Sequence, residues 1–280
     1  MIATTPESAG VTDIGGRENN EDSFSILARG QLIVVADGMG GHAGGDQASA
    51  QAVSSTAKCL DEFDLGLLED AEPGSQSQMV KKLLLAMIDR ANADIFKLND
   101  GATGRGRMGT TLTLAYVAAK CLHIAWVGDS RVYLLRRGIL TQLSDDHTLN
   151  YELFKRGLMS REELRATTAG HGSNVITRSL GADSVEPDYL EVPLEDGDIL
   201  LCCSDGLNNS VPPELLQKHL MQEGGVQEIS AALVQNALAL SARDNVTAVV
   251  TRVRMPAAAP GSAVVRRRSW LQQLRDWLLS

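Results

Sequence analysis

Residues 32–45 read LIVVADGMGGHAGG, an apolar run that ends in Asp37 and continues into a glycine-rich segment. Five consecutive apolar residues before the acid are typical of a buried strand, and glycine lets the chain turn closely around whatever the carboxylate binds. Residues 198–205, DILLCCSD, repeat the pattern, with Asp205 followed by Gly206. A carboxylate at the end of a buried strand is held by a rigid element, which is where a binding residue is expected.

Two further acids stand at the ends of apolar runs. Asp129 closes WVGD, and Asp244 opens DNVTAVV. Any single Asp-Gly pair is an ordinary turn former, so the prediction rests on the whole set. Carboxylates that converge repel one another unless a cation neutralises them. Since the chain has no paired His or Cys at ligand spacing, Mg²⁺ or Mn²⁺ is favoured over zinc.

The remaining pattern predicts an α+β domain, because strand-like runs follow one another without the regular alternation of a parallel α/β fold. Arg136, Arg137 and Gly138 predict a hairpin turn, and residues 66–78 a polar turn. Residues 145–174 form a polar insert with short-helix character, either functional or a plain surface excursion. The predicted strands are 31–36, 110–118, 122–128, 131–135, 139–143, 198–203 and 246–253, and the predicted helices are 45–62, 78–98 and 226–241.

Seven short motifs occur in an order and spacing that resemble the PP2C-like (PPM) family of metal-dependent serine/threonine protein phosphatases, in its bacterial form. The similarity runs from about residue 10 to 253. The motifs are RENNED (17–22), ADGMGGHAGG (36–45), GTTLT (109–113), VGDSR (127–131), NVITRSLG (174–181), CSDGL (203–207) and RDNVT (243–247).

This resemblance implies a phosphatase domain over residues 1–254, built as four layers α-β-β-α around an antiparallel β-sandwich. It implies hydrolysis of phosphoserine and phosphothreonine in proteins by water that two Mn²⁺ or Mg²⁺ ions activate for direct attack on phosphorus. Phosphorylated proteins would be the partners, with the enzyme opposing a bacterial serine/threonine kinase.

The family pattern assigns Asp37 to both metal ions, the carbonyl of Gly38 to one of them, and Asp205 with Asp244 to the other. Glu21 and Asp22 would hold metal-bound water or support Asp37. Asp129, together with Asp205, resembles the site of a weaker third ion.

Arg17 would bind the substrate phosphate, since an arginine suits two-pronged phosphate recognition. Met39 stands where many relatives carry a His that is proposed to protonate the leaving group, so His42 and metal-bound water are both candidates for the acid. In the insert at 145–174, which corresponds to the family's flap beside the active site, His147, Arg161 and His171 are candidates for contact with a phosphoprotein.

Composition narrows the classes of partner and location. The formal charge is −9, and the segment from Arg254 onward holds five Arg and one Asp, so residues 1–253 carry −13. Nucleic acid is therefore not expected as a partner. Four cysteines without CxxC spacing, no basic-then-apolar leader and no long apolar run favour the cytoplasm. The oligomeric state cannot be derived from sequence, and a monomer is the default expectation.

The C-terminal segment differs from the rest of the chain. Residues 255–263 have the Pro, Ala and Gly content of a linker, and residues 264–280 predict an amphipathic basic helix. Such a helix could pack on the domain, bind a partner protein or lie on an anionic membrane surface.

Two other functions compete with phosphatase activity. Residues 38–43, GMGGHA, match the GxGxxA spacing of a dinucleotide-binding oxidoreductase. Asp37 would, however, point a negative charge at the pyrophosphate. The second alternative is a non-catalytic regulator that uses the PPM fold to bind a phosphoprotein, although such a protein is expected to lose at least one of the metal-ligating acids.

Overall fold

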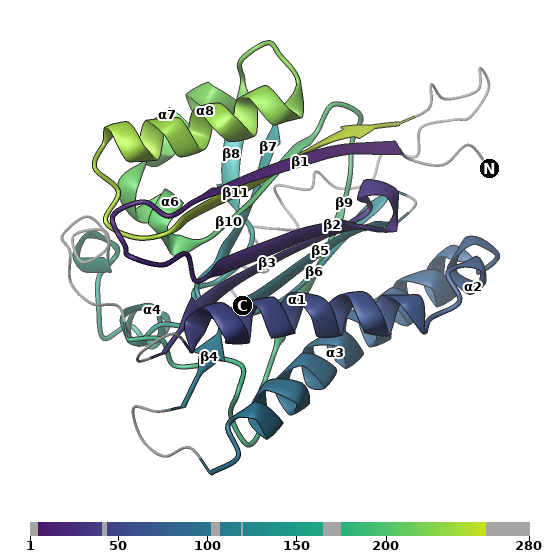
Figure 1. The fold of residues 1–280 in the computed structure, drawn as a ribbon. Helices are drawn as coiled ribbons and strands as arrows, with labels where there is room; N and C mark the ends of the chain where they lie inside the picture. The colour runs from purple at the N-terminus through teal and green to yellow at the C-terminus, as the bar shows by residue number, and fades with distance from the viewer. Residues whose placement is uncertain (1–4, 41–43, 102–106, 119, 165–174, 256–280) are drawn as a thin grey trace.

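The computed structural model describes residues 5–40, 44–101, 107–118, 120–164 and 175–255. Two antiparallel sheets pack face to face, with α1 and α3 on the outside of one and α7 and α8 on the outside of the other (Figure 1). This is the four-layer α-β-β-α arrangement implied by the sequence motifs.

The first sheet has the strand order β2-β3-β5-β6-β9, and β4 pairs with the end of β3. In β2 and β3, Asp22 lies directly opposite Asp37, and Leu27 opposite Leu32 at the other end. The strands are β2 (Asp22–Leu27), β3 (Leu32–Met39), β4 (Gly109–Thr110), β5 (Leu112–Ala118), β6 (Cys121–Val127) and β9 (Asp188–Pro193).

The second sheet has the order β1-β11-β10-β7-β8. Its central strand β10 pairs antiparallel with both β11 and β7. The strands are β1 (Thr5–Asp13), β7 (Arg131–Arg136), β8 (Ile139–Gln142), β10 (Ile199–Cys203) and β11 (Val246–Arg254).

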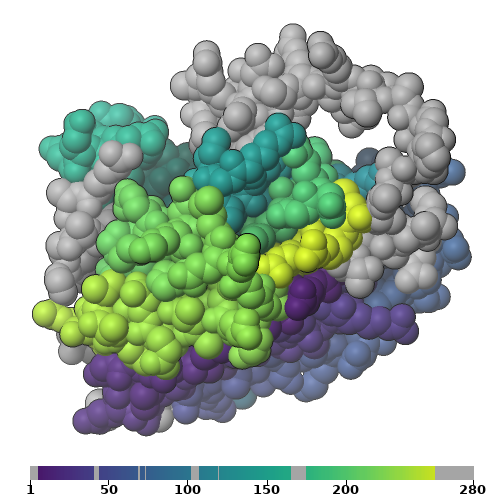
Figure 2. Space-filling view, turned by 90° about the horizontal axis from the view of Figure 1, so that it is seen from above, coloured from purple at the N-terminus to yellow at the C-terminus, as the bar shows by residue number. Residues whose placement is uncertain are grey.

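The helices cover the outer face of each sheet. Figure 2 shows α7 and α8, in green to yellow-green, next to β1 in purple. The helices are α1 (Gly45–Asp61), α2 (Gly66–Glu69), α3 (Pro73–Leu98), α4 (Leu149–Lys155), α6 (Asp205–Ser210), α7 (Pro213–Leu220) and α8 (Val226–Ala239), and a 3₁₀ turn, η1, spans Ala28–Gly30.

The apolar run of β3 is continuous because both of its faces are buried. Leu32 and Val34 pack against α1 and α3, whereas Ile33 and Val35 pack in the core between the two sheets. Successive side chains of a strand point to opposite faces, so Asp37 continues the row of Ile33 and Val35 and faces the second sheet. The strand therefore brings this carboxylate toward the opposing layer.

All seven predicted strands and all three predicted helices are present, with boundary shifts. The predicted hairpin is confirmed, because Arg136 pairs with Ile139 across Arg137 and Gly138, which have φ of 51° and 76°. Such positive φ values are those of a two-residue type I′ turn. The insert contains α4, as its short-helix character predicted.

The prediction of a polar turn over residues 66–78 is wrong. It contains α2 and the first residues of α3, which begins at Pro73, a residue suited to the first helical position. Leu68 is buried, and its carbonyl accepts a hydrogen bond of 2.6 Å from the Gln76 side chain. These tertiary contacts stabilise helix in a segment whose polar composition favours a turn.

The dinucleotide-binding alternative does not fit this topology. A dinucleotide site needs a strand, a helix and a second strand parallel to the first. Here β3 runs antiparallel to both β2 and β5. None of the described helices combines the length and the apolar character that crossing a bilayer demands.

Residues 256–280 of the C-terminal segment lie outside the described part of the structure. The predicted linker and basic helix therefore stay predictions.

Candidate metal and phosphate site

Asp37 and Asp22 form the centre of an acidic cluster where β2 and β3 approach the second sheet. Their Cα atoms are partners in the β2–β3 ladder. One oxygen of Asp22 accepts hydrogen bonds of 2.6 Å from Ser204 Oγ and 2.7 Å from Thr247 Oγ1. Since Ser204 follows β10 and Thr247 lies in β11, Asp22 links the two sheets beside Asp37.

The backbone of Asp37 is fixed by two threonines. Its N–H donates to Thr111 Oγ1 over 2.9 Å, and its carbonyl accepts from Thr111 N at 2.8 Å and Thr110 Oγ1 at 2.9 Å. Thr111 Oγ1 is also within 2.8 Å of Ser130 Oγ, next to Asp129. These bonds fix both backbone polar groups of Asp37 and hold the residue that carries the carboxylate.

Gly38 does not make the turn that the sequence suggested. Strand β3 continues through it to Met39 and pairs with β4. A Cβ on Gly38 would come within 2.1 Å of the Gly45 carbonyl oxygen and 2.6 Å of that of Glu21. Glycine is therefore required by the close approach of two other backbone segments, one of them the start of α1.

Asp205 and Asp244 approach the cluster from the second sheet. Asp205 begins α6 two residues after the end of β10, and Asp244 lies two residues before β11. Arg17 Nη2 forms an ion pair of 2.7 Å with Asp244 Oδ2. The predicted phosphate-binding arginine thus lies beside a predicted metal ligand, at a side-chain exposure of 54%.

Asp129 follows β6 and is buried, with a relative exposure of 4%. Two residues further along, the largely buried side chain of Arg131 makes two hydrogen bonds to Asp146, of 2.8 and 2.6 Å, and a third to Tyr133. Its positive charge acts against the rise in the pKa of Asp129. The guanidinium of Arg131 therefore offsets part of the negative charge of the cluster.

Burial and mutual repulsion raise the pKa of four of these acids. Burial is the largest cause in each, followed for Asp37 by the charges of Asp22, Asp205, Asp129 and Asp244. The pKa of Asp22 rises to about 6 and that of Asp205 to about 7. The pKa of Asp129 rises to about 8, and that of Asp37 lies well above its usual value. Five acids from distant parts of the chain thus act on one another electrostatically.

The cluster has the donor atoms for a hard cation. One carboxylate oxygen of Asp22 and one of Asp129 are buried without a hydrogen-bond partner. Within the described ranges, no group of three or more His, Cys, Asp or Glu side chains is arranged so that it could hold a metal ion by itself. Mg²⁺ and Mn²⁺ retain several waters and accept backbone carbonyls, so they do not require such a closed cage. The residues fit a hydrated cation of this type.

The Glu21 side chain lies beside Gly45, the first residue of α1, and its carboxylate accepts a hydrogen bond from the Gly45 backbone N–H. Its own backbone is held by Asn245, whose Oδ1 accepts from Glu21 N at 2.8 Å. The amide of Asn245 donates to the carbonyls of Ile14 and Asn19. Asn245 therefore fastens the loop that carries Arg17 to the beginning of β11.

The prediction that His147 is exposed for contact with a phosphoprotein is wrong. Its relative exposure is 3%, and its ring accepts a hydrogen bond from the Gly128 backbone. The polar segment around it suggested a surface loop, but the side chain fills space beside Trp126. Arg161 is exposed and lies over the ring of Phe154. His42 and His171 lie outside the described residues.

Sequence reasoning missed the side chains that hold the acids in place, namely Ser204, Asn245, Thr247 and Arg131. Each stands within three residues of a predicted metal ligand. A polar residue beside an acid at the end of an apolar strand is the signal that could have identified them. Their partners, however, lie up to 225 residues away along the chain, as in the Thr247–Asp22 bond, and such pairs cannot be assigned from local sequence.

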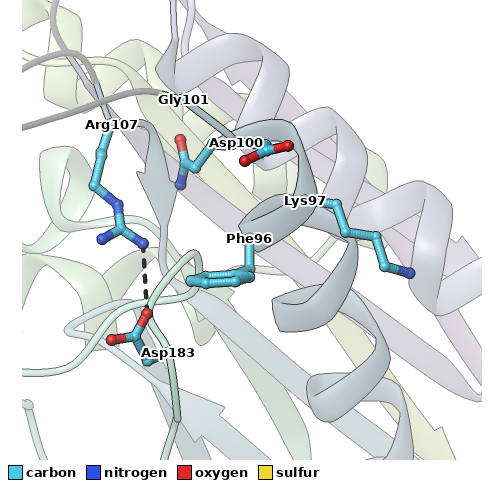
Figure 3. A pocket seen from close by; sticks show the side chains of 7 residues that line it. Phe96, Lys97, Asp100, Gly101, Arg107 and Asp183 are labelled. Carbon is cyan, nitrogen blue, oxygen red and sulfur yellow. Dashed lines mark ion pairs between the residues drawn. The ribbon is translucent and has the colours of Figure 1, made fainter.

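Two hollows lie on the α3 side of the acidic cluster. One, of about 590 Å³, is lined partly by Met39 and Gly40, which directly follow Asp37 and Gly38. The other, of about 350 Å³, contains Phe96, Arg107 and Asp183 (Figure 3). Arg107 lies 5.5 Å over the Phe96 ring and 4.0 Å from Asp183. Neither hollow gathers converging carboxylates, so the metal-site assignment stays with the acidic cluster.

Comparison with known proteins identifies the family. Residues 9–239 match protein phosphatase 2C. The chain is 34% identical over 238 residues to the serine/threonine phosphatase stp of Listeria monocytogenes, covering 84% of this chain and 90% of that protein. It is 36% identical over 241 residues to the serine/threonine protein phosphatase PstP of Mycobacterium tuberculosis, covering 85% of this chain and 43% of that longer protein.

A solved structure agrees with these matches. The catalytic domain of the serine/threonine phosphatase PstP, in complex with two manganese ions, superposes with a TM-score of 0.75 at 34% identity, covering 90% of this chain and all of that one. The resemblance drawn from the seven motifs is thereby confirmed. With matching sequence over most of its length and a matching fold, the chain belongs to the protein phosphatase 2C family.

Proposed function

We propose that the acidic cluster binds two divalent cations, Mn²⁺ or Mg²⁺, through Asp37, the carbonyl of Gly38, Asp205 and Asp244. The chain is a metal-dependent serine/threonine protein phosphatase that acts on phosphorylated proteins, as its family membership establishes. The observation that carries the metal assignment is the convergence of five acids, two of them with buried and unpartnered oxygens. Such a concentration of negative charge is stabilised by bound cations.

The other residues of the cluster have supporting roles in this proposal. Asp129 and Asp205 hold a weaker third ion, while Glu21 and Asp22 orient metal-bound water and Asp37. Two bound divalent ions lower the pKa of a water between them, which makes hydroxide attack on phosphorus possible near neutral pH. Arg131 offsets part of the negative charge and keeps Asp129 and Asp205 more ionised than burial alone would allow.

Arg17 binds the substrate phosphate. Its guanidinium is half exposed and already lies at the edge of the cluster, 2.7 Å from Asp244. Two parallel hydrogen bonds from a guanidinium suit phosphate oxygens. We also propose that the physiological substrates are products of a serine/threonine kinase and that the chain acts in the cytoplasm as a monomer.

Metal dependence tests the assignment directly. We expect the purified chain to release inorganic phosphate from a phosphothreonine peptide in the presence of Mn²⁺, and to lose this activity when EDTA is added. Activity should return when Mn²⁺ is supplied in excess over the chelator. Full activity in EDTA would contradict the metal site, and the absence of turnover with either Mn²⁺ or Mg²⁺ would favour a non-catalytic phosphoprotein-binding role.

Replacing Arg17 tests its contact with the phosphate. We expect Arg17→Ala to lower kcat/KM for the phosphopeptide about 10- to 100-fold, because hydrogen bonds to charged groups contribute about 1.5–3 kcal/mol. The decrease in kcat/KM should come mainly from a higher KM. Arg17→Lys should recover part of it, since lysine keeps the charge without the two-pronged geometry.

Arg29→Ala is the matched control for Arg17. Arg29 is also exposed, but it lies in the β2–β3 connection, at the opposite end of these strands from Asp22 and Asp37. Its removal should leave KM unchanged. Equal effects of the two alanine variants would argue for general charge attraction rather than phosphate binding by Arg17.

A further inference from the structure

His147 holds both backbone polar groups of Gly128, the residue directly before Asp129. Its Nδ1 accepts the Gly128 N–H at 3.1 Å, and its backbone N–H donates to the Gly128 carbonyl at 3.0 Å. Gly128 has a φ of 106°, and a Cβ there would come within 2.5 Å of the Thr111 side chain. The chain path into Asp129 is thus held from one side by His147 and limited from the other by Thr111.

The imidazole itself is fixed in orientation and tautomer. Because Nδ1 accepts a hydrogen bond, the neutral ring carries its proton on Nε2. Nε2 lies 3.3 Å from Asp188 Oδ2, and Arg178 Nη1 lies 3.3 Å from Nε2 and 3.0 Å from Asp188 Oδ1. The ring also stacks on Trp126, with centroids 6.1 Å apart and planes at 22°.

The same residue joins the two ends of the insert that contains α4. The carbonyl of His147 accepts from Thr177 N at 2.9 Å, and Leu149 N donates to the Val175 carbonyl at 2.9 Å. Thr148 and Ile176 form a β-bridge between these bonds. His147 therefore lies where the base of the insert meets the segment that carries Asp129.

From these contacts we infer that His147 is a positioning residue for the third-ion site. It fixes the backbone at Gly128 and thereby the placement of the buried carboxylate of the next residue, Asp129. This inference rests on the proposed function, because it takes Asp129 as a ligand of the weaker ion. It assigns no proton transfer and no substrate contact to the imidazole.

Two amide substitutions separate the two hydrogen bonds of the ring. In His147→Asn, the side-chain oxygen occupies nearly the position of Nδ1 and can accept from Gly128 N–H, while the contact with Asp188 is lost. In His147→Gln, the amide reaches the position of Nε2 and can contact Asp188, while the acceptor for Gly128 is lost. The inference requires that the first variant behaves like wild type and the second does not.

The measurement is Mn²⁺ binding by the full chain, followed through the electron paramagnetic resonance signal of free Mn²⁺. We expect wild type to bind two ions tightly and a third weakly. His147→Gln should lower the affinity for the third ion about 10-fold or more and leave the affinity for the first two ions unchanged. Residues that orient metal ligands typically affect metal affinity by 10- to 100-fold. His147→Asn should stay within about 3-fold of wild type. Hydrogen exchange of the Gly128 amide should accelerate in His147→Gln alone.

His123→Gln is the control for the loss of a buried imidazole. His123 is 2% exposed and lies in β6, the same strand that leads to Asp129, but it bonds to Tyr189 instead of the Gly128 backbone. The variant His123→Gln should lower the melting temperature without changing the affinity for the third ion. Equal affinity for the third ion in His147→Gln and His147→Asn would overturn the inference. A wild-type chain that binds only two Mn²⁺ ions would also overturn it. If the wild-type chain bound no Mn²⁺ at all, the proposed function would be overturned instead.

Discussion

Asp37→Asn is expected to lower phosphopeptide turnover by at least three orders of magnitude, on the order of the effect of removing a catalytic group from a hydrolase active site. Asn has nearly the same volume as Asp, so packing at the end of β3 is preserved. The backbone bonds to Thr110 and Thr111 do not involve the carboxylate and should remain. The variant therefore removes a charged ligand and little else. The measurement is kcat for phosphate release at saturating Mn²⁺.

The stability of this variant should change in opposite directions with and without metal. In EDTA, Asp37→Asn should melt at or above the temperature of wild type, because burial and repulsion by Asp22, Asp205 and Asp129 disfavour the ionised carboxylate that the variant replaces with a neutral amide. In Mn²⁺, wild type should gain stability of about 2.7 kcal/mol at an ion concentration of about 100 times Kd. The variant should gain much less.

Asp64→Asn provides the matched control. Asp64 is exposed, and its side chain accepts a hydrogen bond from Gly66 N, a role that Asn can also fill. Turnover and the Mn²⁺-induced rise in melting temperature should be unaffected. If Asp37→Asn kept more than a tenth of wild-type turnover, Asp37 could not be the residue shared by both ions.

The second large effect concerns stability instead of catalysis. Arg136 and Asp198 form a buried ion pair, each side chain 2% exposed, with Arg136 Nε 2.8 Å from Asp198 Oδ1. We expect Arg136→Met to lower the free energy of unfolding by about 3–5 kcal/mol, because it leaves a buried carboxylate without its counter-charge. The measurement is urea denaturation of the full chain followed by circular dichroism.

Arg137→Met is the neighbouring control. Arg137 also pairs with a carboxylate, Glu195 at 2.7 Å, but its side chain is 73% exposed. Exposed pairs contribute only about 0–1 kcal/mol, so the variant should unfold almost as wild type does. The double variant Arg136→Met with Asp198→Leu should recover part of the loss, since no buried charge then lacks a partner. Equal losses in Arg136→Met and Arg137→Met would show that burial does not govern the energy of this pair.

Elements with a strong apolar pattern could be predicted from the sequence, and the missed strands share a physical reason. Strands β1, β2 and β9 were not predicted, and all three are edge strands. An edge strand buries less of its surface, so its side chains need not be apolar, as TPESAGVTD in β1 illustrates. Pairing with β11 along nine residues forms β1, and that partner lies more than 230 residues away.

The sequence by itself determined the family, through seven ordered motifs, and with the family the four-layer fold that the resemblance implies. It also singled out the acids that meet, because they stand at the ends of apolar runs. It did not determine how those acids are held. The Asp22 bonds to Ser204 and Thr247, the contact of Gly38 with the start of α1, and the burial of His147 against Gly128 each join segments that pack only after folding. Only the tertiary structure decided these contacts, since hydrogen bonds and close packing depend on distances in space that a local pattern does not contain.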